Sequence, residues 1–447
     1  MKVGVCPVID TVSTKGFCVG CGFCAGTCPI GVLSMSLNLA GEYTPELKGD
    51  CTRCGKCLRV CPFGPDRIEC TGLDDQTSLL GGDDLTVCGG HVVDETARRQ
   101  RSSGGLLTEL LCYLLEKKAI NGAVVVGKNP IGGTSFFITH LARSNDEITG
   151  AAGSKYFPVQ FADVLGEIRG FDGKVAFVGL PCHCTALKQT LQHDSDLREK
   201  ISFIFGLTCG HQVTMAFTEF LASMTLVPLN EAESMSYRVK SPNVAACNFS
   251  FGIARSETES QYRLPFRGSG FGQAWRRRLF TMNACEFCPD VFAEQADATF
   301  MDAWLPPYAE EPGGTSLVVA RKESVPFALQ GLVDDYRIKI WPMSAEDVIR
   351  SQEGVVKYKR TLLPTRVHHA LVRNLPVPTF VRDCARSGNR REIRQIRRNE
   401  RNIKIARTIW EYSWLPARGR SKLILALTSP LGGAGFRDIA RKLLGRK

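Results

Sequence analysis

Cysteines near the start of the chain fall into two copies of one spacing. Each copy reads Cys-x2-Cys-x2-Cys-x3-Cys-Pro, and the copies begin at Cys18 and Cys51. Three thiolates spaced by two residues can bind one face of a 4Fe-4S cluster, and the fourth, just before proline, points to the other cluster. The pattern therefore predicts two 4Fe-4S clusters and electron transfer. The predicted ligands are Cys18, Cys21, Cys24 and Cys61 for one cluster, and Cys51, Cys54, Cys57 and Cys28 for the second.

Glycines within the two copies favour a backbone that lies close to a cluster. Gly20, Gly22 and Gly55 allow tight curvature, and Gly26 is expected to loosen the next turn. Structural zinc is the alternative, but zinc sites usually pair two Cys-x2-Cys knuckles instead of using a run of four cysteines that ends in proline. We therefore expect a bacterial-type two-cluster ferredoxin fold over residues 1–72.

Four later cysteines form a looser set. Cys182 and Cys209 each follow a stretch that reads as a buried strand, and Cys285 and Cys288 form a Cys-x2-Cys knuckle. Open α/β sheets build their sites at the carboxyl ends of strands. The four cysteines could form a third site, or the first two could be small buried side chains and the knuckle a turn. Spacing alone leaves both interpretations open.

A turn at residues 102–105 indicates a different chemistry. The sequence Ser-Ser-Gly-Gly follows several arginines and leads into a helix expected over residues 106–118. The amides of a first helical turn, together with nearby arginines, attract phosphate. Such a turn is more often a simple N-cap, so this signal is weak on its own.

The elements that must position these residues follow from the hydrophobic pattern. The 447 residues are too many for one core and favour two or three domains. We expect a ferredoxin domain over 1–72, a linker over 73–97, an α/β body over 98–335 and a basic, mainly helical extension over 336–447. The predicted strands are 123–126, 135–139, 174–178 and 202–205, with helices over 106–118, 185–191 and up to residue 224, and a hairpin or a short strand and helix over 30–43.

The composition is that of an ordinary globular protein, with 44% hydrophobic and 23% charged residues. The 19 cysteines are far above ordinary usage, but the first residues have no apolar stretch of the kind found in secretory signals. No run of about 18 uncharged apolar residues occurs either. We therefore expect a cytoplasmic protein whose reduced thiols are available as metal ligands.

Six motifs occur in order along the body. They are Arg101-Ser-Ser-Gly-Gly105, Ser154-Lys-Tyr156, Gly179-Leu-Pro-Cys182, Cys209-Gly210, Cys285-x2-Cys288, and Ala296-Asp297 with Asp302-x-Trp304. Together they resemble the beta subunit of coenzyme F420-reducing hydrogenases and dehydrogenases, over about residues 85–335, with the ferredoxin module fused in front. The resemblance implies an α/β fold specific to that family, a noncovalent FAD and a 4Fe-4S cluster near it.

The resemblance also implies roles for individual residues, and two of them are the catalytic candidates. Lys155 would lie near the isoalloxazine ring, where a cation stabilises the reduced flavin, although by itself it reads as a surface lysine. His183, where a glutamine is common, would donate a proton or be a hydrogen-bonded histidine. Met301 stands where a glycine is common, which puts a close approach there in doubt. The implied third-cluster ligands are Cys182, Cys209, Cys285 and Cys288, and the implied FAD contacts are Arg101, Ser103, Gly104, Gly105, Lys155 and Tyr156.

Much of the net charge of +11 is local. Residues 381–407 hold ten Lys and Arg against three Asp and Glu. A helix there would carry a narrow apolar stripe flanked by arginines. It could pack on the body, contact an acidic membrane surface peripherally or dock an acidic electron donor. We expect no nucleic-acid partner, because a basic run without a recognised module is a weak signal. The stripe consists of Ile393, Ile396, Ile403 and Trp410.

These observations predict an iron–sulfur flavoprotein oxidoreductase. A donor such as ferredoxin or a partner subunit would reduce the clusters, and FAD would pass electrons in pairs to a deazaflavin or another small organic acceptor. Relatives include reductases of chlorophyll-pathway pigments and proteins associated with polysaccharide assembly. The alternatives are an electron-transfer subunit whose substrate site lies on another chain, and a non-redox iron–sulfur protein that binds nucleic acid.

Overall fold

The structure is a computed structural model that describes residues 6–67, 78–82, 84–130, 135–256, 258–411 and 416–429. Residues 73–77 and 83 of the predicted linker lie outside this part of the chain. Among the described residues, no helix is both long and apolar enough to cross a membrane.

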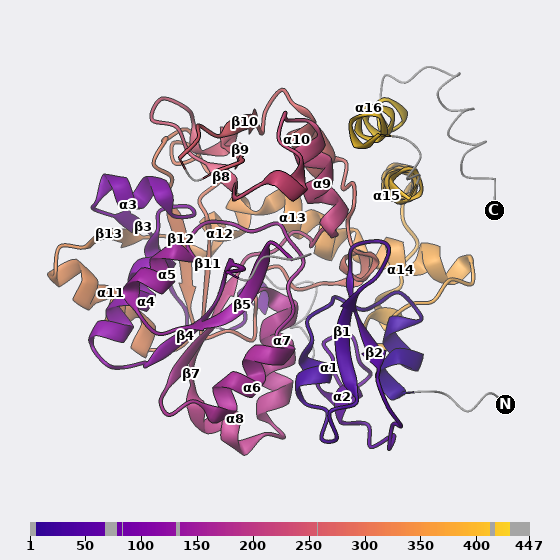
Figure 1. The fold of residues 1–447 in the computed structure, drawn as a ribbon, viewed down its shortest axis with the longest axis horizontal. Helices are drawn as coiled ribbons and strands as arrows, with labels where there is room; N and C mark the ends of the chain where they lie inside the picture. The colour runs from indigo at the N-terminus through magenta and orange to yellow at the C-terminus, as the bar shows by residue number, and fades with distance from the viewer. Residues whose placement is uncertain are drawn as a thin grey trace.

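The N-terminal module contains the two cysteine repeats around an antiparallel hairpin (Figure 1). Of the two alternatives for residues 30–43 the hairpin is present, but it extends beyond residue 43: β1 (Leu33–Leu37) pairs with β2 (Tyr43–Leu47), with Leu33 opposite Leu47. Each repeat also forms one short helix, α1 (Phe23–Gly26) or α2 (Lys56–Arg59), and a π-helix, η1 (Ile9–Ser13), precedes them.

The body is built on an eight-stranded sheet with the strand order β13-β3-β12-β11-β7-β6-β4-β5. Strands β4, β6, β7 and β11 run parallel to one another, and the remaining strands pair antiparallel on either side of them. The four strands predicted from the sequence are β4 to β7. The strands are β3 (Thr86–Val92), β4 (Gly122–Lys128), β5 (Phe137–Ala142), β6 (Val175–Gly179), β7 (Ile201–Leu207), β11 (Ala298–Asp302), β12 (Ser316–Ala320) and β13 (Ile338–Pro342).

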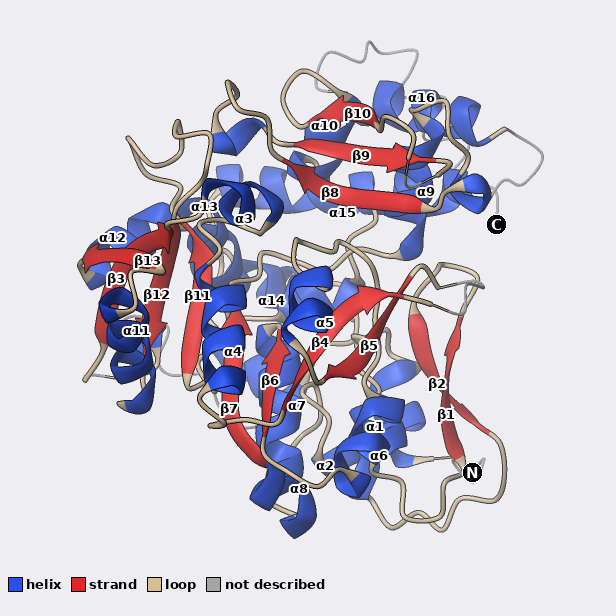
Figure 2. Cartoon of the chain, turned by 60° about the vertical axis from the view of Figure 1, so that its left-hand side comes forward, coloured by secondary structure: helices blue, strands red, loops and turns tan. Residues whose placement is uncertain are grey.

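Helices cover both faces of this sheet, because each face is apolar (Figure 2). One face packs on α4 (Leu106–Glu116) and α11 (Ser324–Asp334). The other packs on α6 (Ala162–Gly170), α7 (Pro181–Leu191) and α8 (Ser195–Lys200). Two short helices, α3 (Glu95–Gln100) and α5 (Asn145–Gly150), complete this part of the body.

A second, smaller sheet lies beside the large one in Figure 2 and was not predicted. Its antiparallel strands are β8 (Ser234–Val239), β9 (Ser250–Ala254) and β10 (Tyr262–Pro265). It is flanked by α9 (Met215–Ser223), the helix expected to end near residue 224, and by α10 (Gly270–Arg276). The short 3-10 helix η5 (Asn283–Phe287) then leads to β11.

The predicted domain bounds need correction at both ends of the body. Residues 86–92 were assigned to the linker, yet they form β3 inside the large sheet. Residues 338–342 were assigned to the extension, yet they form β13 beside β3. Gly89 and Gly90 lie in β3, and glycine is uncommon inside strands, so the sequence does not indicate this strand. The two glycines leave room for Trp341 and Ile340 of β13, whose atoms would lie within 3 Å of an added Cβ.

The extension is mainly helical, as predicted, and packs on the body. In α15 the buried apolar residues are Ile396, Ile405, Ala406, Ile409 and Trp410, whereas Ile393 and Ile403 of the predicted stripe are only partly buried. Because the body covers this face, it is not available for a membrane surface. The elements are α12 (Ala345–Ser351), α13 (Glu353–Val356), the π-helix η6 (Lys357–Thr361), α14 (Leu363–Val372), the 3-10 helix η7 (Thr379–Cys384), α15 (Arg390–Trp410) and α16 (Ala417–Thr428).

Candidate metal centres and cofactor site

The two cysteine repeats have the same local geometry. In the first, the Gly20 N–H donates to Cys18 Sγ at 3.4 Å, and in the second the Arg53 N–H donates to Cys51 Sγ at 3.3 Å. Both donors have a positive φ, +70° for Gly20 and +57° for Arg53. The backbone therefore curls around the first cysteine of each repeat and presents an amide to sulfur, which is how such loops tune a bound cluster.

Thiols of the two repeats lie in one buried cluster within the module. Burial raises the pKa of Cys24 well above its usual value, and Cys21, Cys18 and Cys61 raise it further. The interaction with Cys61 joins the end of the second repeat to the first repeat, as crosswise ligation requires.

The second set is less complete. Burial raises the pKa of Cys57, and Cys51 and Cys54 add to the effect. Cys28 is partly buried just after α1, and its place in this set stays a prediction. Cys6, which has no motif to mark it in the sequence, lies with its Sγ 4.0 Å from Cys57 Sγ and is fully buried.

The four later cysteines come together at one place in the body. Cys182 lies in the first turn of α7, just after β6, and Cys209 follows the end of β7. Cys285 lies in η5 and Cys288 just after it. All four are buried, and after burial the largest contributions that raise the pKa of Cys182 come from Cys288, Cys209 and Cys285. No three metal-binding side chains of the described residues lie close enough to hold a single ion, whereas a cluster core is larger.

Gln212 is a further residue of the third cysteine site, and the sequence did not indicate it. Its backbone N–H donates to Cys285 Sγ at 3.2 Å, and its side-chain Nε2 donates to Cys182 Sγ at 3.2 Å. Hydrogen bonds to sulfur stabilise the thiolate form and tune a cluster. The only available signal was its position three residues after Cys209.

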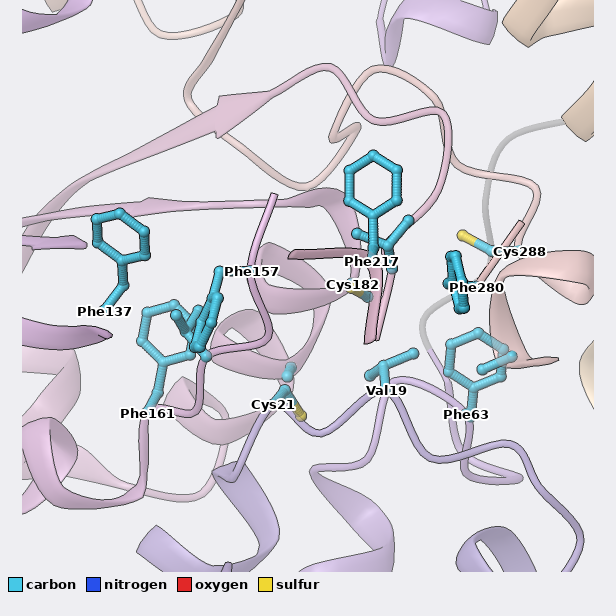
Figure 3. Close-up of a cluster of buried hydrophobic side chains, with 14 of the residues drawn as sticks. Val19, Cys21, Phe63, Phe137, Phe157, Phe161, Cys182, Phe217, Phe280 and Cys288 are labelled. Atoms are coloured by element: carbon cyan, nitrogen blue, oxygen red, sulfur yellow. The ribbon is translucent and has the colours of Figure 1, made fainter. Parts of the chain in front are cut away.

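The third site adjoins the N-terminal module. Cys21 of the first repeat also contributes to the raised pKa of Cys182, and Figure 3 shows both in one buried apolar cluster together with Cys288. Across this boundary the Phe161 N–H donates to Cys21 O at 2.9 Å, and Gln189 Nε2 donates to Cys61 O at 3.4 Å. The module and the body therefore hold two predicted cluster sites at a fixed separation.

The predicted FAD loop is tightly packed at the start of α4. Ser103 Oγ donates to Thr315 O at 2.6 Å, and the Gly104 N–H donates to Ser316 Oγ at 2.9 Å. Gly104 must be glycine, since an added Cβ would lie 2.4 Å from Gly90 O. Gly105, with a φ of +84°, begins α4 without a side-chain cap, which leaves the positive end of the helix for an anion.

Positive charge surrounds a small cavity next to this loop. Ser103, Arg238, Lys240 and Trp304 are among its lining residues, and Arg238 is paired with Asp302 at 2.7 Å. These groups and the helix terminus suit a phosphate-bearing ligand. The cavity holds about 10 Å³, the size of a single water, so a dinucleotide would fit only after lining side chains move.

Arg101 and Lys155, two predicted flavin contacts, are held by local partners. Arg101 forms an ion pair with Glu109 of α4. The Lys155 ammonium donates to the carbonyls of Ala151, Ala152 and Gly153, just after α5, and burial lowers its pKa to about 7. Lys155 thus caps a helix end in this structure.

Tyr156 connects the predicted flavin loop to the third cysteine site. Its ring lies 4.5 Å from the ring of Trp275, and Trp275 lies 4.3 Å from the ring of His211. His211 is two residues after Cys209. The three rings form a continuous aromatic bridge between the two predicted cofactor sites, and neither Trp275 nor His211 was predicted.

The surroundings of His183 do not support its predicted role as a proton donor. The side chain is 2% exposed and packs against the ring of Phe161 at 4.8 Å. Its Nδ1 accepts the N–H of Leu180 at 3.3 Å, at the start of α7. Because burial lowers the pKa of His183 to about 3, the ring is neutral near pH 7. It is a helix-capping residue in this structure.

The N-terminal module contains two cysteine repeats, and the α/β body that it adjoins contains four more buried cysteines. This combination is typical of an iron–sulfur electron-transfer protein. The family models agree. A 4Fe-4S dicluster domain matches residues 17–65, and the coenzyme F420 hydrogenase/dehydrogenase beta subunit N-terminal and C-terminal models match residues 87–166 and 172–346. The last two together span more than half of the chain, which belongs to the coenzyme F420 hydrogenase/dehydrogenase beta subunit family.

Two of the relatives are named as beta subunits of oxidoreductases. The coenzyme F420 hydrogenase subunit beta of Methanothermobacter thermautotrophicus is 24% identical, over 61% of this chain and 94% of that protein. The F420-dependent formate dehydrogenase subunit beta of Methanocaldococcus jannaschii is 27% identical, over 28% of this chain and 32% of that protein. A chain of the F420-reducing nickel–iron hydrogenase complex of Methanosarcina barkeri superposes with a TM-score of 0.47 and 18% identity, over 62% of this chain and 90% of that one.

Proposed function

We propose that the chain is an iron–sulfur flavoprotein that passes electrons from a donor, through the two N-terminal clusters and a third cluster, to FAD and then to a deazaflavin or another organic acceptor. The main support is the position of Cys182, which Gln212 joins to Cys285 by hydrogen bonds and which lies in one buried cluster with Cys288 and with Cys21 of the module. One thiol is thereby near both its own set and the preceding one, as a path of single electrons requires.

The chain's own residues would have three tasks in this function. The twelve predicted cysteines would hold the clusters, with Cys54 exposed on the side from which a donor protein could approach. Trp275 and His211 would span the space from the third cluster to Tyr156. The start of α4 at Gly105 would bind the pyrophosphate of FAD. FAD, when bound, converts single electrons into a two-electron transfer.

Anaerobic purification of the whole chain tests the cofactor set. We expect about twelve irons and one FAD per chain. Cys285→Ser should lose about four of those irons and leave the two N-terminal clusters intact, as electron paramagnetic resonance would show. About eight irons without flavin in the unaltered chain would contradict the proposed third cluster and FAD.

A second candidate is an electron-transfer subunit whose substrate site lies on another chain. The small volume of the cavity beside Ser103 favours it, because no acceptor fits there without rearrangement. Adding a deazaflavin to the chemically reduced, purified chain separates the two. Turnover without a partner supports the first proposal, and reduced flavin that turns over only with an added partner protein supports the second.

A further inference from the structure

A segment beyond the family-matched region packs on the third cysteine site. It spans residues 357–366, from η6 into α14, and follows residue 346, where the family match ends. Arg366 Nε donates to Glu286 O at 2.7 Å, and its Nη1 donates to Tyr358 O at 2.6 Å. The Tyr358 hydroxyl donates to the Glu286 carboxylate. These bonds fasten the segment to η5, the helix that contains Cys285.

Lys359 reaches from this segment into the site. Its side chain is 2% exposed, and its ammonium donates to Cys209 O at 3.2 Å and to Asp290 O. Burial of an ammonium costs several kcal/mol unless an opposite charge compensates it. Main-chain carbonyls satisfy its hydrogen bonds but supply only partial charge, so the position calls for an anion close by.

Two other buried cations of this region have carboxylate partners, whereas Arg366, like Lys359, donates to main-chain carbonyls. Arg278 pairs with Glu286 at 3.0 Å, and Arg360 pairs with Glu294.

Lys359 instead faces the cysteines. It interacts electrostatically with Cys288 and Cys209, then with the buried carboxylate of Asp290, and then with Cys285. Four thiolates around an iron–sulfur core carry net negative charge, which is the compensation that a buried ammonium needs.

We propose that Lys359 is the charge partner of the cluster held by Cys182, Cys209, Cys285 and Cys288, and that it raises the reduction potential of that cluster. The proposal rests on the proposed function, because it requires the third cluster. Reduction adds one electron from the N-terminal clusters and takes up no proton, so the negative charge of the site grows. A fixed cation in a desolvated site stabilises the more negative form. Lys359 is therefore a positioning residue that makes the third cluster the preferred acceptor of electrons from the module.

Potentiometric titration of the whole iron-loaded chain, followed by electron paramagnetic resonance, tests this. Lys359→Met keeps the length of the side chain and removes the charge, and we expect the midpoint potential of one cluster to shift to more negative values. The potentials of the two N-terminal clusters should not change. Lys359→Arg keeps the charge and should retain most of the original potential. Lys188→Met, on α7 with Cys182, is the matched control and should leave all three potentials unchanged.

Three outcomes decide the proposal. A third cluster that is present in Lys359→Met at an unshifted potential overturns it. If Lys359→Met loses about four irons while Lys359→Arg keeps them, the charge is required to hold the cluster, which supports the proposal. If both variants lose these irons, the cluster depends on the shape of the side chain at position 359 and not on its charge, and the proposal fails. Iron in the unaltered chain is measured first, so that absence of a third cluster, which would refute the proposed function, is distinguished from these results.

Discussion

The buried ring of His183 stabilises the start of α7 and is not placed for proton transfer. It stands beside Cys182, at a sequence position that would suit proton transfer, yet its Nδ1 accepts the Leu180 N–H at the start of α7. That bond orients the first turn of α7, and the first turn places Cys182 in the third site. Its low pKa means that it carries no exchangeable positive charge near neutral pH.

Two substitutions separate the capping role of His183 from a chemical one. His183→Gln supplies an amide oxygen that can accept the same N–H, so stability should stay within about 1 kcal/mol of the original. His183→Ala loses the bond and leaves a cavity, which should cost about 2–4 kcal/mol. Urea unfolding of the anaerobic protein measures both effects. If His183→Gln kept its stability but lost flavin reduction, the ring would have a chemical role after all.

At the residue scale, the cysteines could be predicted but their neighbours could not. The two repeats have a spacing typical of two-cluster ferredoxins, so eight candidate ligands follow from the sequence. Gln212 and Lys359 act on sulfur or on its surroundings only because the fold brings η5, η6 and the ends of β6 and β7 together. No local pattern records a contact between segments so far apart in the chain.

At the scale of elements, α10 carries the side chain that joins the two proposed cofactor sites. Trp275 lies between Tyr156 and His211, which come from loops on different sides of it. The helix is positioned by Phe271, which is fully buried against Phe217 and Phe249. One face of α10 thus packs on the body through Phe271, and another face places the Trp275 ring between Tyr156 and His211.

Replacement of Trp275 tests this bridge. Trp275→Leu keeps an apolar side chain but removes the ring, so reduction of FAD by the third cluster should slow while reduction of the clusters themselves is unchanged. Phe220→Leu on α9 is the matched control, since it also loses a buried ring but packs against Phe280 and Trp410, off the bridge. Stopped-flow absorbance at flavin and cluster bands would follow both steps. Equal rates in Trp275→Leu and the unaltered chain would show that electrons take another route.

Elements with a strong hydrophobic pattern were predicted, and those without one were not. The parallel strands β4, β6 and β7 are buried on both faces and read as continuous apolar runs. By contrast β3 contains Gly89 and Gly90, and β10 is largely exposed, so neither has a pattern that distinguishes it from a loop. In α15 the arginines made the polar face evident, but the apolar stripe was misplaced because Ile405 and Ile409, not Ile403, face the body.

At the scale of the whole molecule, the ferredoxin-like module is part of the body and not an appendage. Its cysteines belong to the same buried cluster as residues of α6 and α7. Phe17 packs edge-on against Phe287 of η5, with ring centroids 5.4 Å apart, and Phe63 packs against Phe380 of the extension at 5.5 Å. Three regions of the chain therefore enclose the predicted cluster sites, and their separations are set by side-chain packing.

Gly26 provides the sharpest test of this docking. It was expected to loosen a turn, but it is the last residue of α1 and lies against α6, where an added Cβ would come within 2.8 Å of Leu165 Cδ1 and 3.0 Å of Ala162 O. Gly26→Val should therefore force the module away from the body at a cost of about 1–3 kcal/mol, without altering any proposed ligand. The N-terminal clusters should keep their irons, while electron transfer from them to the third cluster slows, because the gap between Cys21 and Cys182 widens.

Gly166→Val, on α6 but facing open space, is the matched control and should change neither. Rapid-reaction spectroscopy gives the rate between clusters, and small-angle X-ray scattering gives the shape. An unchanged rate in Gly26→Val, with a more open shape, would show that electrons do not need the docked module to reach the body.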